Sequence, residues 1–188
     1  MENKFVFRRA HLNDIDSLSK LCEQTYREAF VEVFSINYPE KDPNSYLRSS
    51  ASPEWFSEKI LDQTRAVWVI EDKTNGELVA YAVAGPADQK DIPHDDLCSN
   101  VDGAIHCFFV RRDYQSHGFG KKLMNIILPW VEEHHPNKPI WLNVWSRNLK
   151  AQRFYTHYGF IKVGEAEFSM GEWKDHDFIM KRQPNHSV

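Results

Sequence analysis

The sequence of 188 residues has no long apolar stretch, no paired cysteines and no excess of positive charge. It contains no run of about eighteen apolar residues, the length that a membrane-spanning helix requires. The cysteines Cys22, Cys98 and Cys107 lie far apart, with no Cys-x-x-Cys pair and no zinc-finger spacing, so we expect reduced thiols and no metal site. The first thirty residues carry several acids and no apolar segment like that of a signal peptide. These absences favour a cytoplasmic protein that does not contact a membrane.

Charge excludes a further class of partner. The 23 basic and 27 acidic residues give a net charge of −4, whereas binding to nucleic acid needs clustered Lys and Arg. We therefore expect no nucleic-acid partner. Hydrophobic residues make up 41% of the chain and aromatic residues 13%, enough for a well-filled core. The length suits one domain, which we expect to cover residues 1–182, followed by a loose polar tail, 183–188.

The order of apolar patterns predicts an α/β fold. Asn13 is a candidate helix N-cap, and Ile15, Leu18 and Leu21 follow it at helical spacing. Further helices are expected from Ser52, over 118–135 and over 148–158, with a loop and a short helix within 36–53. Lys73 to Gly76 predicts a hairpin turn. The expected strands are 5–7, 66–70, 78–84, 104–110, 140–145, 161–164 and 178–181. This order predicts a mixed sheet of about six to seven strands flanked by helices.

Two local features interrupt this pattern. Residues 86–102 carry five aspartates, Asp88, Asp91, Asp95, Asp96 and Asp102, and a single basic residue, Lys90, which predicts an acidic loop. Pro129 falls inside the predicted helix 118–135, where an interior proline costs about 3 kcal/mol and removes a hydrogen bond. We therefore expect this helix to bend or to end early.

A glycine-containing turn feeds the helix that begins near residue 118. Gly118 and Gly120 are one residue apart at the junction of a strand and a helix. Glycine adopts positive φ and has no Cβ, so the backbone there can approach a ligand closely. The first N–H groups of a helix have no intrahelical partner and form an anion site suited to a pyrophosphate. Lys121 would add a positive charge. On its own, the pattern also fits an incidental helix start.

A second motif lies about thirty residues later. At helical spacing, Asn148, Ala151, Gln152 and Tyr155 share one face of the predicted helix, and Gly159 follows its end. A small alanine between a polar amide and a phenol is unusual for a core-facing stripe. It suits a helix face against which a ligand lies.

Together the two motifs resemble the GNAT acetyltransferase superfamily. The matching residues are Gln115-x-x-Gly118-x-Gly120 and Asn148-x-x-Ala151-x-x-Phe154-Tyr155-x-x-x-Gly159-Phe160. The resemblance is clear over 104–182, and it implies acetyl-CoA as cosubstrate. It also implies that the backbone of the fourth strand pairs with the pantetheine arm and polarises the thioester carbonyl. The coenzyme contacts that it implies are Phe108, Phe109, Val110, Gln115, Ser116, His117, Gly118, Phe119, Gly120, Lys121, Asn148, Ala151 and Tyr155.

Two side chains are candidates for the chemistry. The resemblance places Tyr155 beside the coenzyme sulfur, where it would protonate the leaving thiolate; the alternative is a packed aromatic ring. Many family members place a glutamate base on the fourth strand, at a position that corresponds here to His106. A neutral histidine can accept the proton of the attacking amine. The alternative is a structural histidine within the sheet.

A narrower resemblance concerns the substrate. The segments 25–30, 46–47, 140–145 and 168–171 resemble the bacterial PaiA-type branch, described as spermidine and spermine N-acetyltransferases. It implies a small-molecule amine as the acceptor. We expect Tyr26, Phe30 and Tyr46 to form an aromatic wall around it, because aromatic faces attract cations, and Trp145 to belong either to this wall or to the core. The alternatives are acetylation of a peptide α-amine or a protein lysine, and a non-catalytic acyl-CoA sensor. The family also leaves a homodimer open.

Overall fold

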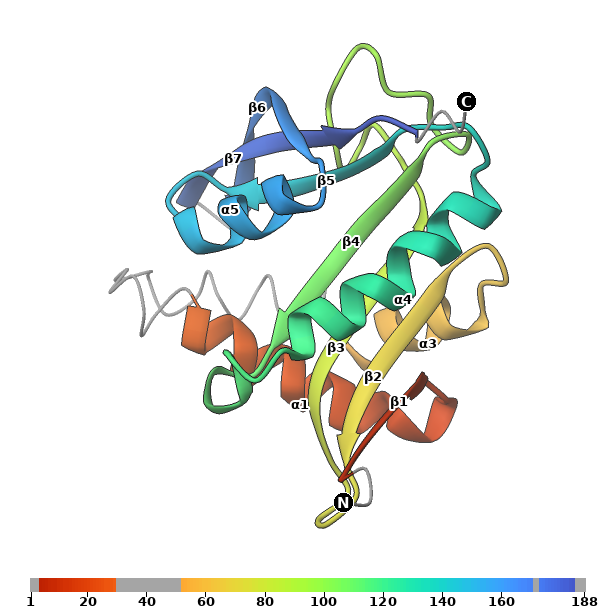
Figure 1. Ribbon diagram of the computed structural model, residues 1–188, viewed down its shortest axis with the longest axis vertical. Helices are drawn as coiled ribbons and strands as arrows, with labels where there is room; N and C mark the ends of the chain where they lie inside the picture. Colours follow the sequence, from red (N-terminus) through yellow and green to blue (C-terminus); the bar gives the residue numbers. More distant parts are fainter. Residues whose placement is uncertain (1–3, 30–51, 171–172, 185–188) are drawn as a thin grey trace. The chain divides into compact units, whose positions relative to one another are not determined.

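Seven strands and four longer helices make up the described part of the chain (Figure 1). The computed structural model describes residues 4–29, 52–170 and 173–184. The predicted loop and short helix within 36–53 therefore fall almost wholly outside the described residues, as does most of the predicted tail. The elements are β1 Phe5–Arg9, η1 Leu12–Asp14, α1 Ile15–Tyr26, α3 Pro53–Leu61, β2 Ala66–Asp72, β3 Glu77–Pro86, β4 Gly103–Val110, η3 Arg112–Tyr114, α4 Phe119–His134, β5 Ile140–Trp145, α5 Leu149–His157, β6 Ile161–Met170 and β7 Trp173–Arg182.

The strands form one sheet in the order β1-β2-β3-β4-β5-β7-β6. The pairs β1–β2, β5–β7 and β6–β7 are antiparallel, whereas β4 and β5 run parallel. The predicted α/β class, with a mixed sheet flanked by helices, is confirmed. Strands β6 and β7 are longer than the sequence predicted, because their pairing continues as far as Met170 with Trp173.

Within this architecture the chain divides into two compact units. The first comprises Met1–Val83 with Cys107–Ile126, and the second Ala84–His106 with Ile127–Val188. Strands β3 and β4 and helix α4 therefore each contribute residues to both units.

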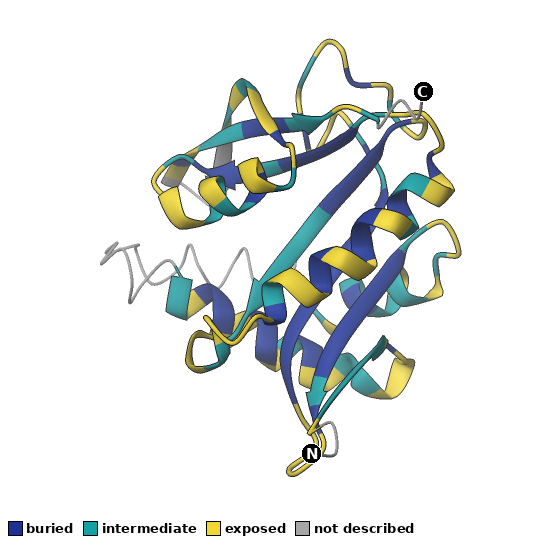
Figure 2. Cartoon of the chain, in the orientation of Figure 1, coloured by how far each residue is buried: buried dark blue, intermediate teal, exposed yellow. Residues whose placement is uncertain are grey.

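The core of the first unit lies between its strands and helices α1 and α3. Figure 1 shows these two helices on one side of β2 and β3, and the first turns of α4 on the other. Leu18 of α1, Phe56 of α3 and Val69 of β2 are fully buried in one cluster, and β2 and most of β3 are buried along their length (Figure 2). Helix α3 begins where the sequence predicted, and Ser52 is its cap, its hydroxyl accepting the backbone N–H of Trp55 at 3.2 Å.

The core of the second unit lies between its strands and the loop 86–102. Ile92 and Leu97 of this loop pack against Trp141 of β5 and Ile179 of β7. The Asp102 carboxylate accepts the indole N–H of Trp141 at 2.9 Å, and both side chains are buried. The acidic loop thus has a defined path over the sheet, held by apolar side chains set between its aspartates.

The prediction for Asn13 is wrong, and one of the two outcomes expected at Pro129, an early helix end, is not found. Asn13 does not cap α1: a 3-10 turn begins at Leu12, and the Asp14 carboxylate accepts the backbone N–H of His11 at 2.7 Å. Helix α4 does not end early at Pro129, because it continues to His134. Pro129 lies on the exposed side of the helix, and the buried side chains of Leu128 and Val131 on either side of it keep the helix packed.

Candidate functional site

The turn between β4 and α4 has the backbone geometry of an anion site. Ser116 and Gly118 both have positive φ, 65° and 80°. The first intrahelical bond runs from the Lys122 N–H to the Gly118 carbonyl at 3.0 Å, so the helix provides no acceptor for the amides of residues 119–121. A Cβ built on Gly118 meets no heavy atom of the described residues within 4 Å, so these residues leave the space beside the backbone open. An anion could approach these amides directly.

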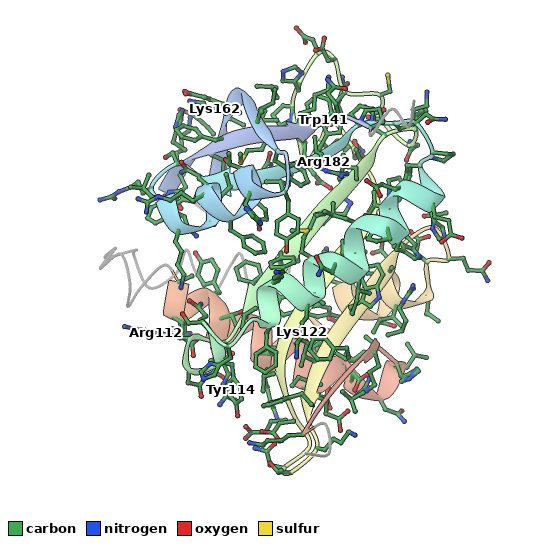
Figure 3. The ribbon with its side chains drawn as sticks, in the orientation of Figure 1. Arg112, Tyr114, Lys122, Trp141, Lys162 and Arg182 are labelled. Carbon is green, nitrogen blue, oxygen red and sulfur yellow. The ribbon has the colours of Figure 1, made fainter. Side chains whose placement is uncertain are left out.

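Aromatic side chains fix this turn to the sheet. Phe119, the first residue of α4, is only 5% exposed, and its ring centroid lies 4.7 Å from that of Phe5. The Lys122 ammonium lies 5.4 Å from the centroid of the Phe7 ring (Figure 3). Lys121 is exposed, as expected for a side chain that would meet a ligand. The helix start is therefore rigid on its buried side and accessible on the other.

Hydrogen bonds from side chains hold the backbone of the rest of the turn in place. Gln115 donates to the Val110 carbonyl at 3.1 Å, and His117 donates through Nδ1 to the Gln115 carbonyl at 2.8 Å. Glu28, two residues beyond the end of α1, accepts the backbone N–H of Arg112 at 2.8 Å. Arg111 forms two hydrogen bonds with Asp113, at 2.8 and 2.6 Å, and these lower the pKa of the Asp113 carboxyl. Most of the polar side chains around the turn thus fix its shape.

The end of β4 lies half-buried beside this turn. The Phe109 ring stacks on Tyr81 with centroids 5.5 Å apart, and the Arg111 N–H bonds to the Val79 carbonyl of β3 at 2.9 Å. These contacts fix the backbone of Phe108, Phe109 and Val110 in extended form. Tyr26, predicted to line the substrate site, is only 3% exposed. Phe30 and Tyr46, predicted for the same wall, lie outside the described residues.

Helix α5, in the second unit, carries the other predicted coenzyme contacts. Asn148 is its N-cap: the side-chain oxygen accepts the backbone N–H of Ala151 at 3.0 Å. Gln152 donates to the carbonyls of Trp145 and Ser146, at 3.1 and 2.8 Å, which attaches the helix to the end of β5. The sequence motif did not predict either structural role. A coenzyme contact by Asn148 and Ala151 stays a prediction.

Tyr155 lies on the inner side of α5. It is 8% exposed, and its ring packs edge-on against Phe160, with centroids 6.0 Å apart. Gly159 follows the helix with φ of 83°, as its position predicted. The buried ring holds the phenol in one orientation, which a general acid needs.

His106 of β4 lies at the point where β4 and β5 part. The two strands pair through Gly103 with Ile140 and Ala104 with Trp141, and this register stops before His106. The imidazole Nε2 lies 3.0 Å from the Pro86 carbonyl oxygen, and Nδ1 lies 3.8 Å from the Asp91 carboxylate. The sequence had placed Asp91 in the acidic loop without linking it to His106.

Acidic and aromatic side chains share the sheet face that this loop covers. Trp145 of β5 is 6% exposed and pairs across the sheet with Asp177 of β7. Partial burial, together with the charge of Asp175 two residues earlier, raises the pKa of Asp177 to about 6. Trp145 lies on the same face as Asn143, because residues alternate along a strand. This face therefore combines an aromatic ring with two acidic side chains.

Two classes of site are not found. Within residues 4–29, 52–170 and 173–184, no three His, Cys, Asp or Glu side chains gather so as to hold a metal ion. None of the helices in the described segments is both long and apolar enough to cross a membrane.

Comparison with known proteins gives one family. The model of the acetyltransferase (GNAT) family matches residues 24–160. An uncharacterized N-acetyltransferase of Mycobacterium tuberculosis is 25% identical over 172 residues, 92% of this chain and 99% of that protein. A spermine/spermidine N(1)-acetyltransferase of Bacillus subtilis is 31% identical over 94 residues, covering 50% of this chain and 59% of that enzyme. The structure of a PaiA N-acetyltransferase from Thermoplasma acidophilum in complex with coenzyme A superposes with a TM-score of 0.71, at 14% identity and covering 96% and 99% of the two chains.

Proposed function

The chain belongs to the acetyltransferase (GNAT) family, and from this premise we propose that it acetylates a primary amine of a polyamine such as spermidine or spermine. Acetyl-CoA-dependent N-acetyl transfer follows from the family and from relatives named as N-acetyltransferases. The observation that carries the proposal is the open glycine turn at the start of α4, with Gly118 at φ of 80° and no atom of the described segments within 4 Å of the position a Cβ would take.

The amides of residues 118–121 would hold the coenzyme pyrophosphate, since helix N-termini stabilise negative charge. Lys121 would add a point charge to the same phosphates. The extended backbone of Phe108, Phe109 and Val110 would bind the pantetheine arm as an added strand and donate an N–H to the thioester oxygen. The whole of 1–182, to the end of β7, would act as the catalytic domain.

The acceptor amine must lose a proton before it attacks. With a reference pKa of about 10.4, only about one primary amine in a thousand is neutral at pH 7.4, and full deprotonation costs roughly 4 kcal/mol. We propose His106 as the base that takes this proton, directly or through a water molecule. Its side chain is 9% exposed, so the ring is held in place yet reachable.

The amine nitrogen then attacks the acetyl carbonyl carbon, and the tetrahedral intermediate collapses as the carbon–sulfur bond breaks. We propose that Tyr155 gives its phenolic proton to the departing thiolate, while the nitrogen of the intermediate releases its remaining excess proton to solvent, from which the phenolate is reprotonated. The buried ring and its contact with Phe160 would keep the hydroxyl aimed at one position. The products are the N-acetylamine and coenzyme A.

A polyamine suits the sheet face around Trp145. Tryptophan is the best of the aromatic side chains for holding a cation, and Asp177 lies opposite it in the sheet, with Asp175 two residues away. A second ammonium group of the substrate would stabilise the charged form of Asp177, whose pKa is raised. The match to the B. subtilis spermine/spermidine enzyme points to the same substrate class. Tyr26, Phe30 and Tyr46 stay proposed members of the aromatic wall.

The test is thiol release from acetyl-CoA with spermidine, spermine, putrescine, lysine and peptides with free N-termini. Saturable release with spermidine or spermine supports the proposal. Release only with peptides would move the acceptor to protein amines. Coenzyme binding without release for any amine would favour a sensor of acyl-CoA.

A further inference from the structure

The orientation of His106 decides which of its nitrogens can gain a proton. Nε2 lies 3.0 Å from the Pro86 carbonyl oxygen, at hydrogen-bond distance. A carbonyl oxygen can only accept, so Nε2 must carry the hydrogen in this contact. In the neutral imidazole, Nδ1 then holds the lone pair. Proton uptake by this ring therefore takes place at Nδ1.

Among the described residues, Asp91 is an acid that faces Nδ1. One of its carboxylate oxygens lies 3.8 Å from Nδ1, and its side chain is 62% exposed. Asp91 is fixed from beneath, because Asn143 of β5 donates through Nδ2 to its backbone carbonyl at 2.7 Å. Its own N–H bonds to the Asp88 carbonyl at 3.1 Å, and the next residue, Ile92, is buried against the sheet. Loop and sheet contacts thus hold the backbone of Asp91 beside the imidazole.

We propose that Asp91 is a positioning residue for His106, stabilising the imidazolium that forms when Nδ1 takes the proton of the acceptor amine. The inference rests on the proposed function, in which His106 is the base. In this step the N–H bond of the substrate ammonium breaks and an N–H bond forms at Nδ1. The positive charge moves from the amine to a ring that has a carboxylate beside it. The proton then passes from Nδ1 to solvent along the exposed side of Asp91.

Other charged groups face this region, and the test must separate them from Asp91. On β7, Asp175 and Asp177 belong to the sheet face that the loop covers, and Lys181 pairs with Asp96 of the loop at 3.6 Å. On β5, Asn143 carries no charge. Asp95, in the same loop, is exposed. Replacing Asp95 removes one negative charge from this loop, as replacing Asp91 does, and so controls for the general field.

The experiment compares Asp91→Asn, Asp91→Glu and Asp95→Asn in the full chain with the most active amine of the panel. The pH dependence of kcat is measured from thiol release at saturating substrates, and the His106 ring is titrated by NMR. Loss of the Asp91 carboxylate makes the imidazolium less favourable. The acid limb of kcat and the NMR midpoint of His106 therefore move to lower pH, by about half a pH unit for so exposed a pair. The plateau of kcat falls about two- to fivefold.

Asp91→Glu recovers most of both effects, because a carboxylate is again within reach, and Asp95→Asn keeps the acid limb of the wild type. An Asp91→Asn profile and NMR midpoint that coincide with those of the wild type would overturn the pairing. The NMR titration needs no turnover, so it tests the pair even where every amine fails. Failure of all amines with the wild type would instead overturn the proposed acetylation.

Discussion

Adding one methyl group at Gly118 should show whether the anion turn binds the coenzyme, apart from any effect of the substitution on the stability of the fold. Gly118→Ala places a Cβ at φ of 80°, where a non-glycine residue costs about 1–2 kcal/mol. Gly76, in the hairpin after β2, has φ of 74°, and its added Cβ likewise meets nothing within 4 Å. Gly76→Ala is therefore a matched control with the same backbone strain. For a chain of this length each variant should lower Tm by about 2–8 °C.

Only Gly118→Ala should weaken coenzyme binding. Its methyl group points into the open space where the pyrophosphate would lie, and relief of the strain would turn the amides of residues 119–121 away. Losing one hydrogen bond to a charged group costs about 1.5–3 kcal/mol, which is about a 10- to 150-fold rise in Kd. Isothermal titration with coenzyme A measures this, and differential scanning calorimetry of the unliganded variants measures Tm.

Gly76 is a close control because its turn is linked to the region around Gly118: Glu77, next to Gly76, pairs with Arg111 at 3.1 Å. Loosening of the shared region would therefore affect both variants. Equal weakening in both variants would mean that the effect comes from general loosening of this region. An unchanged Kd in Gly118→Ala would refute the assignment of the phosphates to this turn.

Three further outcomes are expected. Tyr155→Phe should lower kcat at least tenfold while leaving the Kd for acetyl-CoA within about twofold, since it removes a proton needed late in the reaction; unchanged turnover would remove the phenol from the mechanism. Gly103→Ala should lower Tm strongly, because its Cβ would lie 2.4 Å from Val131 Cγ1; a wild-type melting curve would contradict this packing. Asp177, whose pKa is raised to about 6 by burial and by Asp175, binds its proton more tightly folded than unfolded, so stability should fall as pH rises from about 4 to about 6. Asp177→Asn should abolish that fall. At pH 7.5 it should raise the free energy of unfolding by at most about 3 kcal/mol, and Tm should rise with it. Equal pH dependence of both proteins would show that Asp177 titrates normally.

The sequence correctly predicted the features that depend on neighbouring residues in the chain. Strands β2 and β3 are buried on both faces and appeared as unbroken apolar runs. Gly118 and Gly159 were predicted from their positions at helix ends, and both have the positive φ that only glycine adopts readily. In each case the cause is local, so the sequence shows it directly.

The missed features depend on residues that meet across the fold. The outer halves of β6 and β7 contain alternating charges, which resemble a loop until the strands pair. Lys174 then faces Glu167 at 2.7 Å, and His176 faces Glu165 at 2.9 Å. The contact of Asp91 with His106 requires the path of the whole loop 86–102 over the sheet, which composition alone does not give. Asn148 was predicted as a ligand contact, but its capping role depended on where α5 begins.

The interleaved chain path of the two compact units has a consequence for how the protein folds during synthesis. The first unit needs Met1–Val83 together with Cys107–Ile126, so its last strand and its anion turn leave the ribosome only after the whole acidic loop. Strand β3 is buried in the finished fold, but until β4 is synthesised one edge of β3 has no partner strand. This apolar edge can then pair with another strand in a non-native way. We expect a nascent chain that stops at about residue 90 to stay protease-sensitive. Protection should appear only once residues beyond about 126 have emerged.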